Sequence, residues 1–273
     1  MSSKVILVTG ASSGIGKAAA RQLVDEGHTV FGAARRVEEM HDIVSSGGHA
    51  IRLDVTDPEN AAACVEHVVE EAGRIDVLIS NAGYGCYGPV ETTPVEDAKL
   101  QFDVNVWGSV RMFQNVLPVM RGQGSGRIVI VSSVLGLVTG HMGAWYCGSK
   151  YALESIADAM RLEVAQFGID VALIEPGGFK TGFSNVAISY LDSNDGDNAY
   201  SEMYTRFLKS YRGKHDQTPS PEPVVDAIAR AVNSESPEIR YLIGDDAIER
   251  MQKRRAMNDR EFDDYLHERF NNA

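Results

Sequence analysis

The chain has 273 residues, of which 44% are hydrophobic and 23% charged, as in an ordinary globular protein that can bury a core without disulfides or metals. Its net charge of −12 argues against two classes of partner, nucleic acids and anionic membranes, because both require a basic surface.

Neither a targeting segment nor an oxidising environment is indicated. The first apolar run, residues 5–8, is too short for a transmembrane helix or for the apolar part of a signal peptide. The three cysteines, Cys64, Cys86 and Cys147, are an odd number without metal-ligand spacing. We therefore expect a cytoplasmic protein with reduced thiols and no bound metal.

Short runs rich in Val and Ile alternate with helical stretches along the chain. The runs cover residues 5–9, 29–34, 50–54, 77–81, 128–132, 171–175 and 241–243. They mostly lack strict alternation of apolar and polar residues, which predicts strands buried on both faces. We expect a single α/β domain over residues 1–273, a Rossmann-type doubly wound fold with a seven-stranded parallel sheet flanked by helices.

Three helix starts are predicted. Asp57 followed by Pro58 is a capping residue with proline at the first helical position. Residues 93–96, Thr-Pro-Val-Glu, predict a capping box ahead of a long helical stretch that ends near Met120. Ser220 with Pro221 begins another helix.

A glycine-rich turn follows the first strand. It contains Gly10, Gly14 and Gly16 and leads into a helical stretch at residues 17–26. Glycines at a strand–helix turn let the backbone approach a pyrophosphate, and the helix N-terminus offers N–H donors. The context favours a dinucleotide site over a tight turn without a ligand.

The ends of the next two strands predict which dinucleotide is bound. Arg35 and Arg36 follow the second strand, where a carboxylate would bind a ribose 2′-hydroxyl. Arginine binds a 2′-phosphate bidentately, which favours NADP(H); the alternative is a solvated charge pair. Asp54 is placed to accept a hydrogen bond from the adenine amino group; its alternative is a helix-cap role, which Asp57 fills.

A tyrosine and a lysine in one predicted helix point to acid–base chemistry. Tyr146 and Lys150 are four residues apart, about one turn, so that the ammonium can lower the phenol pKa. Ser133, thirteen residues before the tyrosine, can bind the same reacting oxygen. Ser132 is the structural alternative.

With these motifs the chain resembles the short-chain dehydrogenase/reductase superfamily over at least residues 4–182. Among its branches it looks most like the NADP-preferring hydroxysteroid and retinol dehydrogenases. The motifs that carry the resemblance, in chain order, are Thr9-Gly-x3-Gly14-x-Gly16, Asp54, Asn81-Ala82-Gly83, Asn105-Val106-x-Gly108, Ser132-Ser133, Tyr146-x3-Lys150 and the segment 176–181.

The resemblance implies a role for each matching residue. Tyr146 is the general acid/base, Lys150 lowers its pKa and holds the nicotinamide ribose, and Ser133 orients the substrate carbonyl. Asn105 anchors a water that links Lys150 to solvent. The cofactor site implied in this way comprises Gly10, Ser12, Ser13, Gly14, Ile15, Gly16, Arg35, Arg36, Asp54, Val55, Asn81, Ala82, Gly83, Tyr146, Lys150, Pro176, Gly177, Phe179 and Thr181.

The substrate pocket is expected to be apolar, with Leu135 and Gly177 beside Ser133 and Tyr146. Its walls are expected from residues 134–145 and from Tyr84, Cys86 and Tyr87. Residues 182–218 form an insertion long enough to act as a lid. Its candidate pocket residues, for which core packing is the alternative, are Phe183, Val186, Ile188, Tyr190, Met203, Tyr204 and Phe207.

Two further features are interpreted as lying outside the chemistry. His141 has no evident partner and is expected to be a polar surface residue. Residues 245–273 form a charged tail with interspersed apolar residues, which predicts an amphipathic helix docked on the body or on a second subunit.

Together these features predict an NADP(H)-dependent oxidoreductase that interconverts a secondary alcohol and a ketone on a small apolar substrate, such as a steroid, a retinoid, or an aryl or alkyl ketone. The hydride comes from the nicotinamide and the proton from Tyr146. A non-catalytic NADP-binding regulator is the alternative; a nucleotide-sugar enzyme would show different glycine spacing. By analogy we expect a homodimer or homotetramer, paired through helices near residues 97–120 and 145–167.

Overall fold

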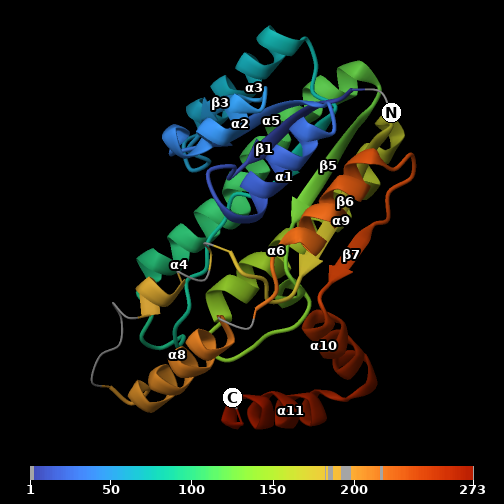
Figure 1. The fold of residues 1–273 in the computed structure, drawn as a ribbon. Helices are drawn as coiled ribbons and strands as arrows, with labels where there is room; N and C mark the ends of the chain where they lie inside the picture. The colour runs from blue at the N-terminus through green and yellow to red at the C-terminus, as the bar shows by residue number, and fades with distance from the viewer. Residues whose placement is uncertain (1–2, 182, 184–186, 192–197, 216–217, 273) are drawn as a thin grey trace.

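The computed structural model, which describes residues 3–181, 183, 187–191, 198–215 and 218–272, contains one parallel sheet in the order β3-β2-β1-β4-β5-β6-β7 (Figure 1). The strands are β1 (Val5–Thr9), β2 (Thr29–Ala34), β3 (His49–Arg52), β4 (Val77–Ser80), β5 (Gly126–Val131), β6 (Ile169–Pro176) and β7 (Arg240–Ile243). The predicted Rossmann-type fold is therefore confirmed.

Helices cover both faces of this sheet. The longer ones are α1 (Gly14–Asp25), α3 (Pro58–Ala72), α4 (Val95–Phe102), α5 (Gly108–Gln123), α6 (Ala144–Val164), α8 (Ser201–His215), α9 (Glu222–Asn233), α10 (Asp245–Ala256) and α11 (Asp259–Asn271). The shorter helical segments are η1 (Val37–Met40), α2 (His41–Ser45), η2 (Asp103–Trp107), η3 (Val134–Gly136) and η4 (Ala165–Phe167).

The sheet separates two apolar cores, and successive residues of each strand face opposite ones. In β1, Leu7 packs with side chains of α3, α5 and α6, whereas Ile6 and Val8 pack with those of α1 and α9. The prediction of strands buried on both faces is thus confirmed for the central strands. It is wrong for β3, the strand at one edge of the sheet, where His49 and Arg52 are exposed and Ala50 and Ile51 are only partly buried.

The helix starts agree with the sequence in part. Asp57 caps α3, and its carboxylate accepts hydrogen bonds from the N–H groups of Glu59 and Asn60. The capping box predicted at residues 93–96 is wrong: α4 begins after Pro94 without a side-chain cap. The Thr93 hydroxyl instead donates to the Pro89 carbonyl, 2.8 Å away. Helix α9 follows Pro221, also without a side-chain cap.

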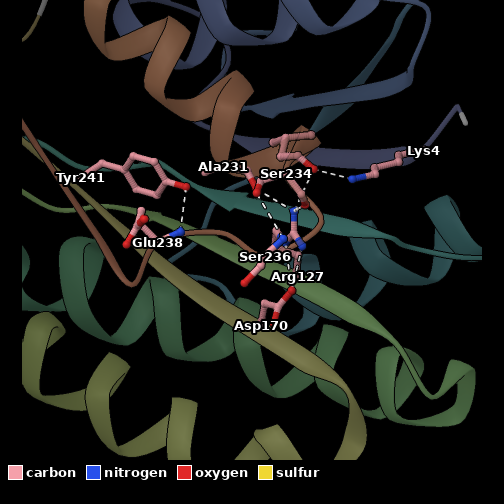
Figure 2. Close-up of polar contacts among 9 residues, drawn as sticks. Lys4, Arg127, Asp170, Ala231, Ser234, Ser236, Glu238 and Tyr241 are labelled. Carbon is pink, nitrogen blue, oxygen red and sulfur yellow. Dashed lines mark hydrogen bonds and ion pairs between the residues drawn. The ribbon is translucent and has the colours of Figure 1, made fainter. Parts of the chain in front are cut away.

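A buried arginine ties α9 to the sheet (Figure 2). Arg127, at the start of β5, donates to the carbonyls of Ala231 (2.7 Å), Val232 (2.9 Å) and Ser234 (2.7 Å) at the end of α9. Its Nε and Nη2 atoms pair with Asp170 of β6 at 3.2 and 2.7 Å. A cation at a helix C-terminus also suits the negative end of the helix dipole. One side chain thereby joins two strands and a helix.

The C-terminal helices pack on the body of their own chain, one of the two docking partners expected from the sequence. Ala247 and Phe262 are buried against Val134 and Val138, in the segment that follows β5. At the far end of α11, the Arg206 guanidinium of α8 donates to Asn271 at 2.6 Å. Helices α8, α10 and α11 thus gather at one end of the molecule (Figure 1). Among the described helices, none has the length and apolar character needed to cross a membrane.

Candidate active site

The carboxyl ends of the strands open onto a cavity of about 750 Å³. With two exceptions, the residues that the family resemblance assigns to the catalytic and cofactor sites line this cavity, and so do Leu135 and Gly177, expected beside the substrate. Gly16 and Asn105 do not, and both lie beneath its wall. Topology explains the convergence, because parallel strands bring the loops at their carboxyl ends to the same edge of a sheet.

The turn after β1 has the form that a pyrophosphate requires. Gly10 and Gly14 adopt positive φ angles of 69° and 59°, which glycine tolerates without strain. A Cβ on Gly10 would lie 2.9 Å from Ala82 Cα, and one on Gly16 would collide with the Asn81 side chain. Ser13 precedes α1 without a side-chain cap, so the first N–H groups of this helix are free of a capping side chain beside the cavity. The residues therefore fit a dinucleotide.

Asn81 ties the start of this turn to the end of β4. Its side-chain N–H group donates to the carbonyl of Thr9 at 3.0 Å, and its backbone N–H donates to the Thr9 hydroxyl at 3.0 Å. Because both bonds join the end of β4 to the end of β1, Asn81 and Ala82 stabilise the sheet edge on which a cofactor would lie.

Two exposed arginines line the part of the cavity beside the end of β2. Arg35 and Arg36 follow β2, and Arg36 donates to the Ser12 hydroxyl at 3.4 Å. Asp54 lies two residues after β3 rather than within it. Its carboxylate accepts from the N–H and hydroxyl groups of Thr56 at 3.0 and 2.7 Å. Burial acts to raise the Asp54 pKa, but these hydrogen bonds lower it overall. Asp54 thus closes a turn of its own, and the helix cap is Asp57, as expected.

Tyr146, Lys150 and Ser133 meet at the inner end of the cavity. All three side chains are buried, and the Lys150 ammonium lies 5.9 Å from the centre of the Tyr146 ring. Ser133 lies next to the phenol, whereas Ser132, the alternative, lies with Glu154 beside Gly136, and its buried hydroxyl makes no hydrogen bond with any described residue. The structure therefore brings together the three groups that their spacing in the sequence predicts to be neighbours.

The expected lowering of the Tyr146 pKa is not found. Burial raises the pKa of this phenol well above its ordinary value, while the Ser133 hydroxyl acts to lower it. Lys150 is itself buried, and its ammonium donates to the Val131 carbonyl at 2.9 Å. Burial lowers the Lys150 pKa to about 8, against the pull of Glu154. Desolvation of both groups outweighs their mutual attraction, which spacing alone could not show.

Asn105 sits in η2, a π-helical turn that interrupts the predicted continuous helix over residues 97–120. The extra residue in this turn points the amide at two partners. It donates to the Tyr84 carbonyl at 3.1 Å and the Ser149 hydroxyl at 3.0 Å, and accepts from the Tyr84 N–H at 3.1 Å. Asn105 thus fastens the loop after β4 to the helix of Tyr146. Its role in holding a water stays a prediction.

A partly buried ionic cluster, which the sequence did not predict, lies one helical turn beyond Lys150. Arg240 of β7 pairs with Glu154 at 3.2 Å, Asp158 at 2.7 Å and Glu175 at 2.9 Å. Burial and the neighbouring Glu154 raise the Glu175 pKa to about 7. The sequence held no signal for this cluster, because its members come from α6, β6 and β7.

The substrate end of the cavity is aromatic. Tyr87 lies 5.6 Å from Tyr146, ring centre to ring centre, and Phe183 lies 5.2 Å from it. Of the insertion residues, Phe183 and Phe207 line the cavity, whereas Tyr204 is buried in the packing beneath α8. The remaining candidates, which do not line it, are Ile188, Met203 and Tyr190, the last of which donates to Asp97. Val186 lies outside the described residues.

Two sequence expectations about this end are wrong. Cys86 is fully buried and does not line the cavity, because its loop turns the thiol into the protein. His141 is not a free surface residue: its ring stacks on Phe270, with centres 4.2 Å apart, and contacts His267 at 3.2 Å. The docked tail, more than a hundred residues away in the chain, supplies both partners.

The tail contributes a wall of the cavity, which the sequence did not predict. The lining residues from α10 and α11 are Asp246, Arg250, Leu266, Arg269 and Phe270. The only signal for them was the amphipathic pattern of the tail, which indicates docking but not its place.

Known proteins match the chain over most of its length. The family model for short chain dehydrogenases matches residues 4–189. A 3-ketodihydrosphingosine reductase of Bacteroides thetaiotaomicron is 36% identical over 245 residues, 89% of either chain. The uncharacterized oxidoreductase YusZ of Bacillus subtilis is 34% identical over 254 residues, 89% of this chain and 90% of that protein. A short-chain dehydrogenase from Streptomyces avermitilis has the same fold, with a TM-score of 0.80 at 35% identity, over 93% of this chain and 95% of that chain.

Proposed function

Because the chain belongs to the short-chain dehydrogenase family, we propose that it is an NADP(H)-dependent oxidoreductase that interconverts a secondary alcohol and a ketone on an apolar substrate. The observation that carries this proposal is one cavity with a glycine-lined turn at one end and Ser133, Tyr146 and Lys150 at the other. A nicotinamide cofactor, when bound, supplies or accepts the hydride.

The side chains at the inner end would manage the proton and the charge on oxygen. Tyr146 donates its phenolic proton to the carbonyl oxygen of a ketone, and Ser133 donates a second hydrogen bond to it. Lys150, charged below a pKa of about 8, favours the tyrosinate left behind. The aromatic wall of Tyr87, Phe183 and Phe207 excludes water from the reacting oxygen.

Replacement of Tyr146 by Phe tests this mechanism. The variant keeps the ring packing but has no proton to donate, so we expect turnover of any accepted ketone to fall at least about a thousandfold. NADPH binding, measured by fluorescence titration, should change little. Turnover close to the wild-type rate would rule out Tyr146 as the acid; NADPH binding without turnover of any ketone by the wild type would favour a non-catalytic regulator.

Replacement of Arg35 by Asp tests the choice of cofactor. A carboxylate at this place repels a 2′-phosphate, so NADPH binding should weaken at least about tenfold more than NADH binding. Dissociation constants for both cofactors provide the measurement. Equal weakening of the two would show that the 2′-phosphate is not bound there. Replacement of the exposed Arg52 on the edge strand by Asp is a matched control, for which both affinities should be unchanged.

A panel of ketones and alcohols, followed by the absorbance of reduced cofactor, would identify the substrate class. The panel includes steroid, retinoid and alkyl ketones, with 3-ketodihydrosphingosine chosen from the name of the Bacteroides relative. We further propose that residues 182–218 act as a lid over the substrate, that the protein forms a homodimer or homotetramer, and that it is located in the cytoplasm.

A further inference from the structure

The wall that the tail adds to the cavity carries an arginine, Arg250 of α10. Its guanidinium faces the substrate end. One of its terminal nitrogens would lie 3.9 Å from a Cβ on Gly140, in the loop between Ser133 and Tyr146. Its charge acts to lower the pKa values of Tyr87, whose ring lies beside that of Tyr146, and of Cys147, the next residue after Tyr146 in the chain. Arg250 is therefore a neighbour of the reacting group and is distinct from the arginines after β2.

This guanidinium has no counter-ion in the described part of the chain. Its Nε atom is buried and makes no hydrogen bond, and its terminal nitrogens make no ion pair or hydrogen bond with any residue that the structure describes. Two other arginines of the tail lie beside carboxylates. Arg254 pairs with Asp259 at 2.8 Å, and Arg269 lies 3.7 Å from Glu249.

The surroundings make an unpaired charge costly at this place. Burial lowers the Arg250 pKa, and the nearby Arg269 adds repulsion, whereas Asp246 acts in the opposite direction. Asp246 lies one turn before Arg250, but one of its carboxylate oxygens accepts a hydrogen bond from the Gly178 N–H at 2.9 Å and no ion pair with Arg250 forms. A buried cation without a partner destabilises a protein unless a ligand pairs with it.

We propose that Arg250 binds an anionic group carried by the substrate, so that the enzyme acts on ketones with an apolar body and a carboxylate or phosphate terminus. This inference rests on the proposed function. The planar fork of a guanidinium accommodates the two oxygens of a carboxylate or phosphate bidentately. The aromatic side chains that line the same cavity suit the apolar body, and Tyr87, on which the Arg250 charge acts, lies beside the Tyr146 ring.

The test compares charged and neutral ketones of the same shape. The probes are oxodecanoic acids with the ketone at successive carbons, the methyl ester of each acid, and the corresponding oxodecyl phosphates. For the wild type we expect kcat/KM to be higher with the best acid, or with the best phosphate, than with the methyl ester that carries its ketone at the same carbon. In Arg250→Met that value should fall about 30- to 100-fold for the anionic ketones and less than about threefold for the esters. The ratio of acid to phosphate in the wild type identifies which anion is preferred.

A matched substitution controls for damage to α10. Arg255 lies on the same helix and is exposed, so Arg255→Met should leave all three substrate series unchanged. The melting temperature separates a binding role from a structural one. Without substrate, Arg250→Met should melt at the wild-type temperature or above it, because it removes an unpaired, partly buried charge. A lower melting temperature together with equal losses on acids and esters would overturn the proposal.

Binding also tests the proposal without turnover. If no ketone is reduced, the proposed function fails, and calorimetric titration of the same acids into the NADPH-loaded protein still measures the contribution of Arg250. Weaker binding of the acids to Arg250→Met than to the wild type would support the anion site. Equal affinities would overturn it.

Discussion

At the scale of single residues, burial decides the charges around Tyr146. The spacing of Tyr146 and Lys150 on α6 predicts a phenol that loses its proton easily, yet burial raises the phenol pKa and lowers that of the lysine. The same effect acts on Glu175, which is only 2% exposed and lies beside Glu154. Two buried carboxyl groups and one arginine cannot all be charged at low cost.

We predict that Glu175 makes the fold less stable as the pH rises. Its folded pKa of about 7 lies above the ordinary 4.5. Between these values the unfolded chain releases the proton that the folded chain keeps, so the free energy of unfolding falls with rising pH and the contribution is complete only below 4.5. Glu175→Gln, which mimics the protonated carboxyl, should gain about 1–3 kcal/mol relative to wild type between about pH 5 and about pH 8.

Urea unfolding at several pH values would measure this difference. Replacement of the exposed Glu163 of α6 by Gln is the control, and its difference from wild type should not vary over the same range. If the curve of Glu175→Gln runs parallel to that of the wild type, Glu175 is already ionised in the folded protein.

At the scale of elements, irregular segments position the site more than the regular helices do. The π-helical turn at Asp103–Trp107 aims Asn105 at Tyr84 and Ser149, although the sequence predicts one continuous helix there. Arg127 sets α9 by binding the carbonyls that end it (Figure 2). The hydrogen bonds of Asn105 and of Arg127 are polar contacts, which the hydrophobic periodicity of the sequence does not predict.

We predict that Arg127→Met lowers the free energy of unfolding by about 2–4 kcal/mol, because it leaves buried carbonyls without donors and removes the partner of Asp170. Chemical denaturation gives the value. Arg230→Met, at an exposed position in the last turn of the same helix, should cost less than about 0.5 kcal/mol. Equal losses in the two variants would mean that only the charge near the helix end matters.

At the scale of the whole molecule, the tail completes the cavity. Phe262 of α11 is 5% exposed and packs against Val134 and Val138, on the segment that follows Ser133. These contacts hold the tail against the segment after Ser133. The positions of Arg250, in the tail, and of His141, which packs on the tail, therefore depend on the docking of the tail. A change in α11 is therefore expected to affect the substrate end and to leave the cofactor end intact.

We predict that Phe262→Ala weakens this docking by about 3 kcal/mol through loss of buried apolar surface. Hydrogen exchange in α11 and η3 should accelerate, and KM for ketones should rise while NADPH affinity is unchanged. Ile248→Ala, at a position 40% exposed on α10, should cost less than about 1 kcal/mol and alter neither. Unchanged exchange in Phe262→Ala would show that α11 is held by its polar contacts.

The sequence by itself determined the features that depend on near neighbours in the chain. Strand and helix order follows from local apolar patterns, the turn at Gly10 and Gly14 from glycine chemistry, and the shared helix face of Tyr146 and Lys150 from a four-residue spacing. Only the tertiary structure decided what lies around them. The ionic cluster of Arg240, the pKa directions and the place of Arg250 in the cavity all depend on burial and on contacts between distant segments. The desolvation of an ionisable group depends on the segments that pack against it in space, and the spacing of residues along the chain does not predict those segments.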